Sequence, residues 1–289
     1  MNTHANSETF EGMGWRPDLP DFRDYTVASP QVSALLAKSK PLKSATAKKL
    51  ATSVDLRAWC SPIENQGNLG SCTANAGVGL LEYFERRAFG RHLDASRLFL
   101  YKATRNLLGW SGDTGAYLRT TMKAMALFGI PPEQYWTYNI ARFDNEPPAF
   151  LYAFAQNYQS IQYYRLDPPG TSPHDIVGWV KTYLAAGLPS MFGFTVYDSF
   201  PAVGTGSGDI PVPGPGEHVL GGHAIDAVGY DDAKKIGKHK GALLIRNSWG
   251  TAWGESGYGW MPYDYIGMGL ADDFWSLVRT EFVDTDLFK

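Results

Sequence analysis

Cys72 stands where a thiol can act as a nucleophile. It ends the glycine-containing stretch 66–72 and opens a predicted helix over residues 71–87. The positive end of a helix dipole lowers the pKa of a thiol and favours the reactive thiolate. An inert buried cysteine is the other interpretation, and position alone does not decide between the two. The sequence therefore offers one candidate nucleophile, which needs partners elsewhere in the chain.

His223 is the best candidate for the base that such a nucleophile requires. Acyl transfer needs a partner that ion-pairs with the thiolate and later gives a proton to the leaving amine. His223 opens a predicted strand over residues 223–230, directly after Gly221 and Gly222, which leave room for a substrate. A purely structural histidine would not require that glycine pair. The other five histidines lie in polar or loop contexts and are expected to be solvated: His4, His92, His174, His218 and His239.

Asn247 can supply the third group of such a site. A working imidazole must be held in one orientation and one tautomer. Asn247 follows the apolar run 242–245, and its amide can accept a hydrogen bond from a ring N–H. Trp249, two residues further on, could shield that hydrogen bond from water. A turn-forming asparagine at a strand end is the alternative, and taken alone it is the more common case.

The elements that must position these side chains change character along the chain. Apolar residues at three- and four-residue spacing predict helices over residues 71–87 and 116–128. Short apolar runs bounded by glycine and charge predict strands at 193–197, 223–230 and 241–247. Gly77 and Gly79 inside the first helix each cost about 1 kcal/mol relative to alanine, so we expect close packing there. The stretch 204–216, rich in Gly and Pro, predicts a long surface loop.

The first 53 residues differ from the rest. The stretch 14–25 mixes prolines, acids and aromatics, which favours an extended strip laid on a surface. Residues 26–53 contain no Asp or Glu but five lysines, which predicts an exposed, protease-sensitive tether. An unstructured tail without a role is the alternative for the tether. It suits the strip less well, because disordered tails are usually poor in aromatic residues.

Composition limits the classes of function. A chain of 289 residues with 44% apolar and 19% charged side chains can bury one large core or two ordinary ones. A net charge of −3 disfavours nucleic acid as a partner. No apolar run reaches the roughly 18 residues that would cross a bilayer, and the first 30 residues lack a basic stretch followed by an apolar one. We therefore expect no membrane span, and a location in the cytoplasm or export by a route without a cleavable signal peptide.

Together, three segments resemble the papain family of cysteine peptidases. They are residues 66–72, residues 222–230 and residues 246–259, and their order along the chain agrees with the family. The resemblance implies an α+β fold with two domains: a helical domain, an antiparallel β-barrel-like domain, and an active-site cleft between them. We expect an N-terminal extension at 1–53, a helical domain at 54–154 and a β-rich domain at 155–289.

The resemblance also implies roles for the catalytic residues. Cys72 would be the nucleophile, His223 its ion-pair partner and later general acid, and Asn247 the group that orients the ring. Gln66 would supply a side-chain N–H to an oxyanion hole that the backbone N–H of Cys72 completes. The chemistry needs no metal or organic cofactor.

Four further residues would contact substrate or cover the site. Trp249 would cover the hydrogen bond between the imidazole and the amide. Gly115 falls where the family pairs with substrate backbone, with an uncertainty of one residue because only one glycine of the usual pair is clear. Ala224 would line the main specificity pocket. Asp226, two residues beyond on the same strand face, would make that pocket acidic and favour a basic substrate side chain; a buried carboxylate paired with a nearby Arg or Tyr is the alternative.

The chain departs from the family pattern beside the nucleophile. Leu69 and Thr73 stand where the family usually has a cysteine and an aromatic residue. The usual disulfide of the helical domain is therefore missing, which suggests a bacterial-type member in a reducing compartment. Cys60 is expected to be a free structural thiol, although its separation from Cys72 also allows a single bridge.

The sequence thus predicts a peptidase that hydrolyses amide bonds of protein or peptide substrates through an acyl-enzyme on Cys72. We expect an endopeptidase made as a zymogen, with its own N-terminal segment in or beside the cleft. Two alternatives stay open: a cell-wall peptide amidase or acyl transferase with the same three residues, and a catalytically silent peptide-binding module on the same fold.

Overall fold

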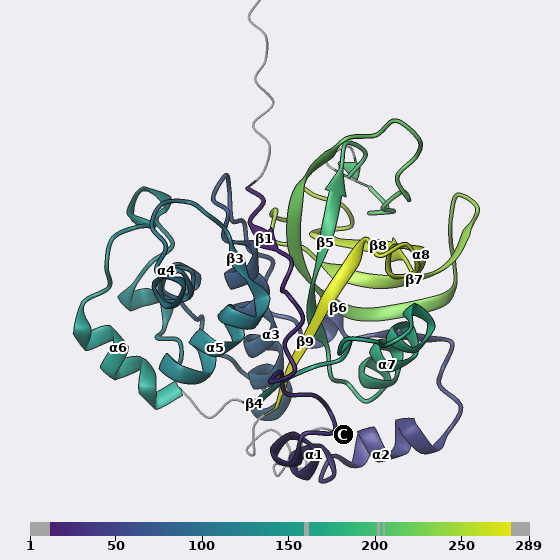
Figure 1. Cartoon of the computed structure of the whole chain (residues 1–289), viewed down its shortest axis with the longest axis horizontal. Helices are drawn as coiled ribbons and strands as arrows, with labels where there is room; N and C mark the ends of the chain where they lie inside the picture. The colour runs from purple at the N-terminus through teal and green to yellow at the C-terminus, as the bar shows by residue number, and fades with distance from the viewer. Residues whose placement is uncertain (1–11, 159–161, 201–202, 205, 279–289) are drawn as a thin grey trace, which may run out of the picture.

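The computed structural model describes residues 12–158, 162–200, 203–204 and 206–278. A helical part and a curved antiparallel sheet lie side by side, and the first described residues run between them (Figure 1). The helical part contains α3 (Cys72–Phe89), α4 (Arg97–Leu108), α5 (Leu118–Phe128) and α6 (Ala149–Ala155). This arrangement confirms the predicted α+β class. None of the described helices is both long enough and apolar enough to span a bilayer.

The sheet has the strand order β4-β9-β5-β6-β7-β8, with β2 also paired to β6, and all its pairings are antiparallel. Residues 223–230 of β6 are buried on both faces because α3 and α7 pack against this strand. The strands are β2 (Ser53–Asp55), β4 (Gln162–Arg165), β5 (Ser190–Tyr197), β6 (Val219–Ile236), β7 (His239–Arg246), β8 (Tyr258–Pro262) and β9 (Ala271–Val278). β2, at the predicted start of the helical domain, pairs with β6 of the sheet. The predicted domain boundaries stay a prediction.

Short elements complete the described chain. They are α7 (Pro173–Ala185), α8 (Asp264–Gly267), and the 3-10 turns η1 (Arg57–Trp59), η2 (Glu133–Tyr135), η3 (Ile140–Arg142) and η4 (Gln156–Tyr158). Within the predicted loop, residues 206–216 cross the surface, and a bridge between Asp209 and Trp260 holds them to β8. Ile210 is fully buried there, so this loop is anchored to the sheet.

Helix α3 is buried almost all round because it lies between α5 and the sheet. A Cβ on Gly77 would lie 3.0 Å from the sulfur of Met125 in α5. A Cβ on Gly79 would overlap the guanidinium of Arg246 in β7. The close packing expected at the two glycines is therefore present on both sides of the helix.

Two local predictions were wrong. The second predicted helix begins at Leu118, because residues 116–117 form β3, which pairs in parallel with β1 (Trp15–Arg16). The tether is also folded, into α1 (Pro30–Leu36) and α2 (Lys40–Ala47). Each has a serine at its N-cap and a proline in its first turn, a start signal that the count of lysines obscured.

We predict that Gly79→Ala destabilises the fold by about 1–3 kcal/mol, the usual cost of overpacking a core. The added methyl group would lie 2.9 Å from Asp226 Oδ2 and would also collide with Arg246. Gly178→Ala is the matched control, because a Cβ at this glycine of α7 meets no atom within 4 Å. Urea denaturation of both variants tests this. Equal stability of the two variants would contradict the close packing.

Candidate active site

Cys72 is the first residue of α3 and is fully buried. The turn before it is fixed by Ser71, whose hydroxyl lies 2.6 Å from the Tyr138 hydroxyl and accepts a hydrogen bond from Asn75 Nδ2 at 3.0 Å. The backbone amide of Ala224 in β6 lies near enough to the Cys72 thiol to lower its pKa. The start of α3 and strand β6 therefore meet at this sulfur. The residue of β6 that lies near it, Ala224, directly follows His223.

His223 and Asn247 come from neighbouring strands, with His223 in β6 and Asn247 directly after β7. Nε2 of His223 lies 2.8 Å from Oδ1 of Asn247. The same Oδ1 accepts the backbone N–H of Ser248 at 2.8 Å, which identifies the atom facing the ring as the amide oxygen. Nε2 therefore carries the proton, and Nδ1 is left as a proton acceptor. Nδ1 is buried and has no hydrogen-bond partner among the described residues.

Trp249 covers this hydrogen bond as predicted. Its ring centroid lies 4.8 Å from that of His223, with 36° between the planes. Trp249 and His223 are 5% and 0% exposed, so water is excluded from the contact between the imidazole and the amide.

Gln66 is held so that its amide N–H points along the cleft. Its Oε1 accepts the hydroxyl of Ser248 at 2.6 Å, and its Nε2 donates to the carbonyl oxygens of Leu69 at 2.9 Å and Gly12 at 2.7 Å. Gly12 belongs to the N-terminal part of the chain. A backbone carbonyl of the protein itself thus occupies the position where the predicted oxyanion donor points.

Residues 12–24, which we call the covering segment, run through the site between the helical part and the sheet (Figure 1). Besides the bond from Gln66, the N–H of Gly12 donates to Gly67 O at 3.0 Å, and Ala116 N donates to Gly14 O at 2.8 Å. The backbone amides of Gly14 and Trp15 lie near enough to the Cys72 thiol to lower its pKa. Residues 12–15 therefore lie against Gln66, Gly115 and Cys72.

Burial under the covering segment sets the charge of the two reacting groups. Desolvation raises the pKa of the Cys72 thiol to about 11, although backbone N–H donors oppose the rise. Desolvation also lowers the pKa of His223 to about 4, against the hydrogen bond to Asn247. Both groups are neutral at pH 7 in this state. The expected low thiol pKa is thus not found here, because the effect of burial exceeds that of the helix dipole.

The residues predicted to contact substrate backbone lie where the covering segment runs. Gly115 has φ +70° and faces Gly14 so closely that a side chain would overlap the Gly14 carbonyl. Its own N–H donates to Tyr101 Oη at 3.1 Å, and the N–H that contacts the segment belongs to Ala116. The backbone pairing is therefore one residue further along than Gly115. Ala224 is buried, and its backbone amide lies near the Cys72 thiol.

Asp226 requires a correction. It lies on the same strand face as Ala224 but further along, under α3, and its Oδ2 lies 3.8 Å from Arg246 Nη1. Arg246 in turn donates to the carbonyl of Pro62 at 2.7 Å, so both charged groups are enclosed. The structure matches the paired alternative, and Asp226 does not acidify a pocket beside Cys72.

Sequence reasoning missed Asp273, whose Oδ2 accepts the indole N–H of Trp15 at 3.3 Å. The local sign of a special role was the pair of adjacent acids, Asp272 and Asp273, in the otherwise apolar strand 271–278. Their partner could not be predicted, because Trp15 lies more than 250 positions earlier in the chain. Gly193, against which the Trp15 ring packs, carried no signal of its own.

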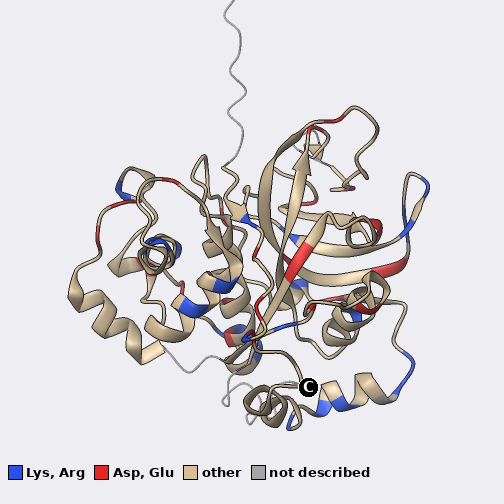
Figure 2. Cartoon of the chain, viewed as in Figure 1, with Lys and Arg blue, Asp and Glu red and all other residues tan. Residues whose placement is uncertain are grey.

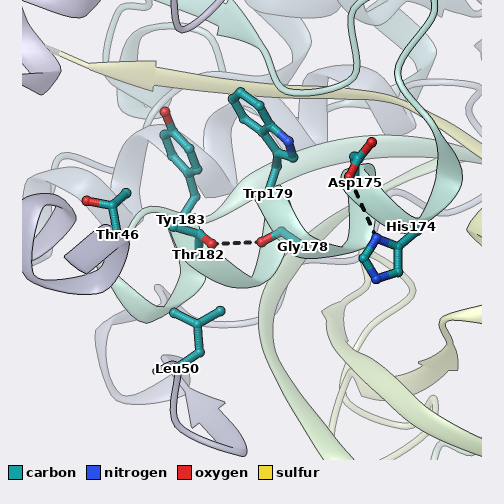
Figure 3. A pocket seen from close by; sticks show the side chains of 8 residues that line it. All are labelled: Thr46, Leu50, His174, Asp175, Gly178, Trp179, Thr182 and Tyr183. Carbon is teal, nitrogen blue, oxygen red and sulfur yellow. Dashed lines mark hydrogen bonds and ion pairs between the residues drawn. The ribbon is translucent and has the colours of Figure 1, made fainter. Parts of the chain in front are cut away.

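Other features of the described residues add no cofactor site. Both cysteines are free, and burial raises the pKa of the Cys60 thiol to about 11. Among the described residues, no group of three or more His, Cys, Asp or Glu side chains is placed to hold a metal ion. A surface cavity of about 400 Å³ between α2 and α7, lined by Trp179, His174 and neighbours (Figure 3), contains none of the predicted site residues.

Comparisons with known proteins agree with this geometry. Residues 50–274 match the family model of papain family cysteine proteases. An uncharacterized peptidase C1-like protein of Acanthamoeba polyphaga mimivirus is 34% identical over 284 residues, which is 95% of this chain and 88% of the viral protein. The crystal structure of xylellain, a cysteine protease from Xylella fastidiosa, superposes on this chain with a TM-score of 0.75 and 34% sequence identity. The match covers 93% of this chain and 96% of the xylellain chain.

Papain from Carica papaya is 29% identical over 206 residues, which is 68% of this chain and half of the papain sequence. The family model covers most of the chain and includes Cys72, His223 and Asn247. The chain therefore belongs to the papain family of cysteine peptidases.

Proposed function

We propose that this cysteine peptidase is an endopeptidase that its own covering segment holds inactive. The observation that carries the proposal is the hydrogen bond from Gln66 Nε2 to the Gly12 carbonyl, together with the backbone N–H groups of Gly14 and Trp15 at the Cys72 thiol. A peptide chain already lies along the path that a substrate would take.

The arrangement of side chains supports hydrolysis in two steps. His223 Nδ1 takes the proton of the Cys72 thiol, and the thiolate attacks the carbonyl carbon of the scissile amide. The oxygen that gains negative charge is met by Gln66 Nε2–H and the Cys72 backbone N–H. The imidazolium then protonates the leaving nitrogen, the C–N bond breaks, and an acyl group stays on the sulfur. In the second step His223 takes a proton from water, whose oxygen attacks the acyl carbon and releases the thiol.

The course of the covering segment favours the endopeptidase mode. The described chain runs from Gly12 at Gln66, past the Cys72 thiol, to Asp18 at Asp273, so the site accommodates peptide on both sides of Cys72. A cleft that holds a continuous chain in this way does not require a free substrate terminus.

The same contacts explain how a bound peptide escapes hydrolysis. The backbone amides of Gly14 and Trp15 lie near the sulfur, and an amide N–H is not a group that a thiol attacks. The carbonyl at the oxyanion position belongs to Gly12, two residues before Gly14 in the segment. In addition, the thiol and imidazole are both neutral while covered, so the ion pair that drives attack is not formed.

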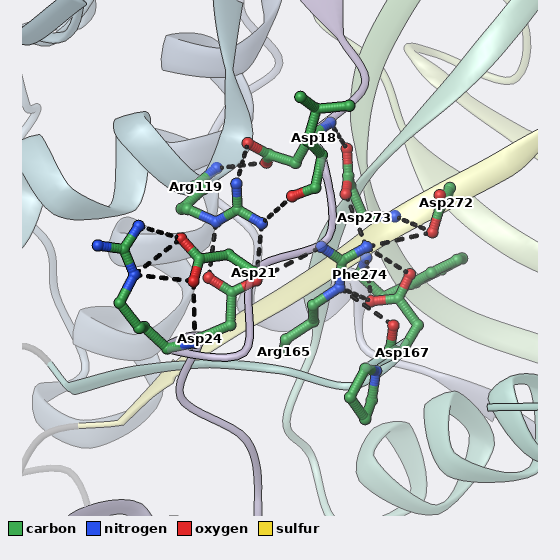
Figure 4. A network of polar contacts seen from close by, with 12 residues as sticks. Asp18, Asp21, Asp24, Arg119, Arg165, Asp167, Asp272, Asp273 and Phe274 are labelled. Atoms are coloured by element: carbon green, nitrogen blue, oxygen red, sulfur yellow. Dashed lines mark hydrogen bonds and ion pairs between the residues drawn. The ribbon is translucent and has the colours of Figure 1, made fainter. Parts of the chain in front are cut away.

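Charged side chains hold the far end of the covering segment (Figure 4). Arg119 of α5 bonds to Asp18 at 3.1 Å and to Asp24 at 2.6 Å, and Arg165 of β4 lies 3.7 Å from Asp24. The N–H of Asp18 donates to Asp273 Oδ2 at 2.8 Å. Acidic and basic residues gather where the segment passes between the two parts of the molecule (Figure 2). We call this set of contacts the latch.

A thiol-reactive peptidyl epoxide tests the proposed function directly. We expect slow labelling of Cys72 in the full chain, faster labelling after removal of residues 1–50, and cleavage of a casein-type substrate by the shortened chain. Cys72→Ser supplies the unlabelled control. Labelling with hydrolysis of peptidoglycan fragments alone would favour the amidase, and a folded, shortened chain that is neither labelled nor active would be a silent binding module. Unchanged turnover on shortening would reject inhibition by the segment.

Asp24→Asn should open the latch without altering the cleft. The substitution removes one negative charge between two guanidinium groups and turns an amide N–H toward one of them. Loss of a charged hydrogen bond of this kind corresponds to roughly tenfold in an equilibrium, so we expect about tenfold faster epoxide labelling of Cys72. Asp21→Asn is the matched control, because Asp21 pairs with the exposed Arg23. Similar labelling rates in both variants would remove the latch from the proposal.

The latch should also weaken as pH rises. Burial raises the pKa of Asp18 to about 6. An exposed carboxyl titrates near pH 4, so between about pH 4 and 6 the covered state binds a proton at Asp18 that the uncovered state does not. Proton binding therefore favours covering at mildly acid pH, and this contribution is lost as pH rises through about 6.

Limited proteolysis of the covering segment measures this dependence. In an inactive Cys72→Ala chain we expect faster cleavage of the segment at pH 8 than at pH 5, after normalisation to an unstructured peptide cut by the same protease. Asp18→Asn should flatten the profile, since the titrating group is gone. A segment that becomes more sensitive as pH falls would show that the sign is wrong.

A further inference from the structure

The turn over residues 66–71 fixes the spacing of the two groups that would meet the oxygen of a substrate carbonyl. Gln66 opens this turn, and the backbone N–H of Cys72 follows it. Within the turn, Leu69 O accepts Gln66 Nε2–H at 2.9 Å and the N–H of Ser71 at 2.8 Å. Both cysteines of the chain are free, so no disulfide braces the turn. Its shape therefore depends on hydrogen bonds from neighbouring parts of the chain.

Asp113 supplies such hydrogen bonds to the middle of the turn. The N–H of Gly70 donates to both carboxylate oxygens, to Oδ1 at 3.0 Å and to Oδ2 at 3.1 Å. The approach is close, because a Cβ on Gly70 would lie 2.8 Å from Oδ1. Asp113 belongs to the loop before β3, 43 residues further along the chain. A carboxylate in one loop thus holds the backbone of another.

A tyrosine extends this contact to the strand that pairs with a bound chain. Tyr101 of α4 is fully buried, and its hydroxyl donates to Asp113 Oδ1 and accepts the N–H of Gly115 at 3.1 Å. The next residue, Ala116, donates to the carbonyl of Gly14 in the covering segment. Burial and the hydrogen bond to Asp113 raise the pKa of Tyr101, so its hydroxyl stays protonated and remains a donor. Asp113 and Tyr101 therefore connect the turn with the pairing strand.

The loop that carries Asp113 is itself held by the helical part of the molecule. The N–H of Gly112 donates to Asp144 Oδ2 at 2.9 Å, and the carbonyl of Gly112 accepts a hydrogen bond from Arg105 of α4. Arg105 also bonds to Asp144 Oδ1 at 2.8 Å. All of these groups lie outside the covering segment, so this support stays in place when the segment leaves.

We propose that Asp113 is a positioning residue for the reaction, which fixes the turn so that Gln66 Nε2–H and the Cys72 N–H point at the same carbonyl oxygen. This proposal rests on the proposed peptidase function. A carboxylate suits the role, because its oxygens accept hydrogen bonds from Gly70 and Tyr101 at once and its charge strengthens both. The substrate oxygen gains negative charge only as the sulfur attacks. Loss of the support therefore slows the chemical step more than it weakens substrate binding.

Peptide hydrolysis by the full-length chain carrying Asp24→Asn tests this role. We expect Asp113→Ala in that chain to lower kcat about tenfold while KM changes by less than threefold. The covering segment competes with substrate, so a change in its release would alter KM and not kcat. Ser111→Ala is the matched control, because it alters an exposed side chain of the same loop, and it should keep kcat within twofold. Unchanged kcat in Asp113→Ala would overturn the proposal.

Two reagents separate the carbonyl-oxygen site from the thiol itself. A peptide aldehyde bonds to the Cys72 sulfur through its carbonyl carbon, and its oxygen takes up the thiol proton where the two N–H donors point. Iodoacetamide is attacked at a saturated carbon, iodide leaves with the bonding electrons, and His223 takes the thiol proton, so no carbonyl oxygen gains charge. We expect Asp113→Ala to weaken aldehyde binding about tenfold and to change alkylation by less than threefold. An equal loss with both reagents would mean that the substitution merely disturbs the fold.

Two milder variants keep the test open if Asp113→Ala does not fold. Asp113→Asn retains one acceptor oxygen, so it should lose less of kcat than the alanine variant. Tyr101→Phe removes the hydroxyl that holds Gly115 but leaves the carboxylate at Gly70 in place. We therefore expect Tyr101→Phe to raise KM for peptides at least threefold with kcat within threefold. A lowered kcat with unchanged KM in Tyr101→Phe would contradict the assignment of the turn to Asp113.

The outcomes also separate this proposal from the proposed function. A parent chain that hydrolyses no peptide would reject the peptidase, and the binding of the aldehyde would still measure what Asp113 does for the two N–H donors. A parent chain that hydrolyses peptides with the same kcat and binds the aldehyde with the same affinity as its Asp113→Ala variant would reject the role of Asp113 alone.

Discussion

The removal of Cys72 and His223 from water is the constraint on which the rest of this structure depends. A thiolate and an imidazolium are each destabilised by desolvation, so burial shifts both pKa values toward the neutral pair. The covering segment therefore does more than obstruct the cleft. It also holds the reacting groups in the protonation state that has the least reactivity. Uncovering the site changes access and charge together, which couples the chemistry to the position of one stretch of chain.

The contacts that block the site and the contacts that hold the segment are spatially separate. Near Cys72 the segment makes neutral backbone hydrogen bonds, to Gln66 and Ala116, which are the groups a substrate would use. Farther along, the latch sets the carboxylates of Asp18, Asp24 and Asp273 against the two guanidinium groups of Arg119 and Arg165. Three acids against two bases leave an excess of negative charge, which a proton can balance. The holding contacts thus respond to pH, while the blocking contacts contain no ionisable group of the segment.

Sequence alone was sufficient for the residues that sit in local motifs. Cys72, His223 and Asn247 are each flanked by neighbours that the chemistry needs, namely a helix start, a glycine pair and a tryptophan, so their types and spacing could be interpreted without coordinates. The change in periodicity along the chain indicated helices early and strands late, and the resemblance to the papain family implied the α+β class. Features that depend on distant partners were not accessible. Asp226 and Asp273 are both acids in apolar strands, and nothing local shows that one faces Arg246 and the other faces Trp15.

The folded tether illustrates a different limit. Its lysines are exposed, as composition suggested, but Val32, Leu36 and Leu42 of the same stretch are buried. A few apolar residues at helical spacing are enough to dock two short helices, and composition averages over them. The register shift between β5 and β9 near Asp273 has the same origin, because register in a sheet is set by the partner strand and not by the sequence of one strand.

The covering segment shows that placing a side chain beside the cleft and presenting a cleavable bond are independent events. The indole of Trp15 packs against Gly193 of β5 and donates to Asp273, while the segment pairs in parallel with β3 and brings its backbone amides near the sulfur. Reversing the direction of a chain along the same path exchanges the places of its N–H and C=O groups. A substrate whose side chain takes the place of Trp15, but which runs antiparallel to β3, would present carbonyl groups where the segment presents amides. Chain direction, and not the side chain beside the cleft, would then decide whether a bound peptide inhibits the enzyme or is cut by it.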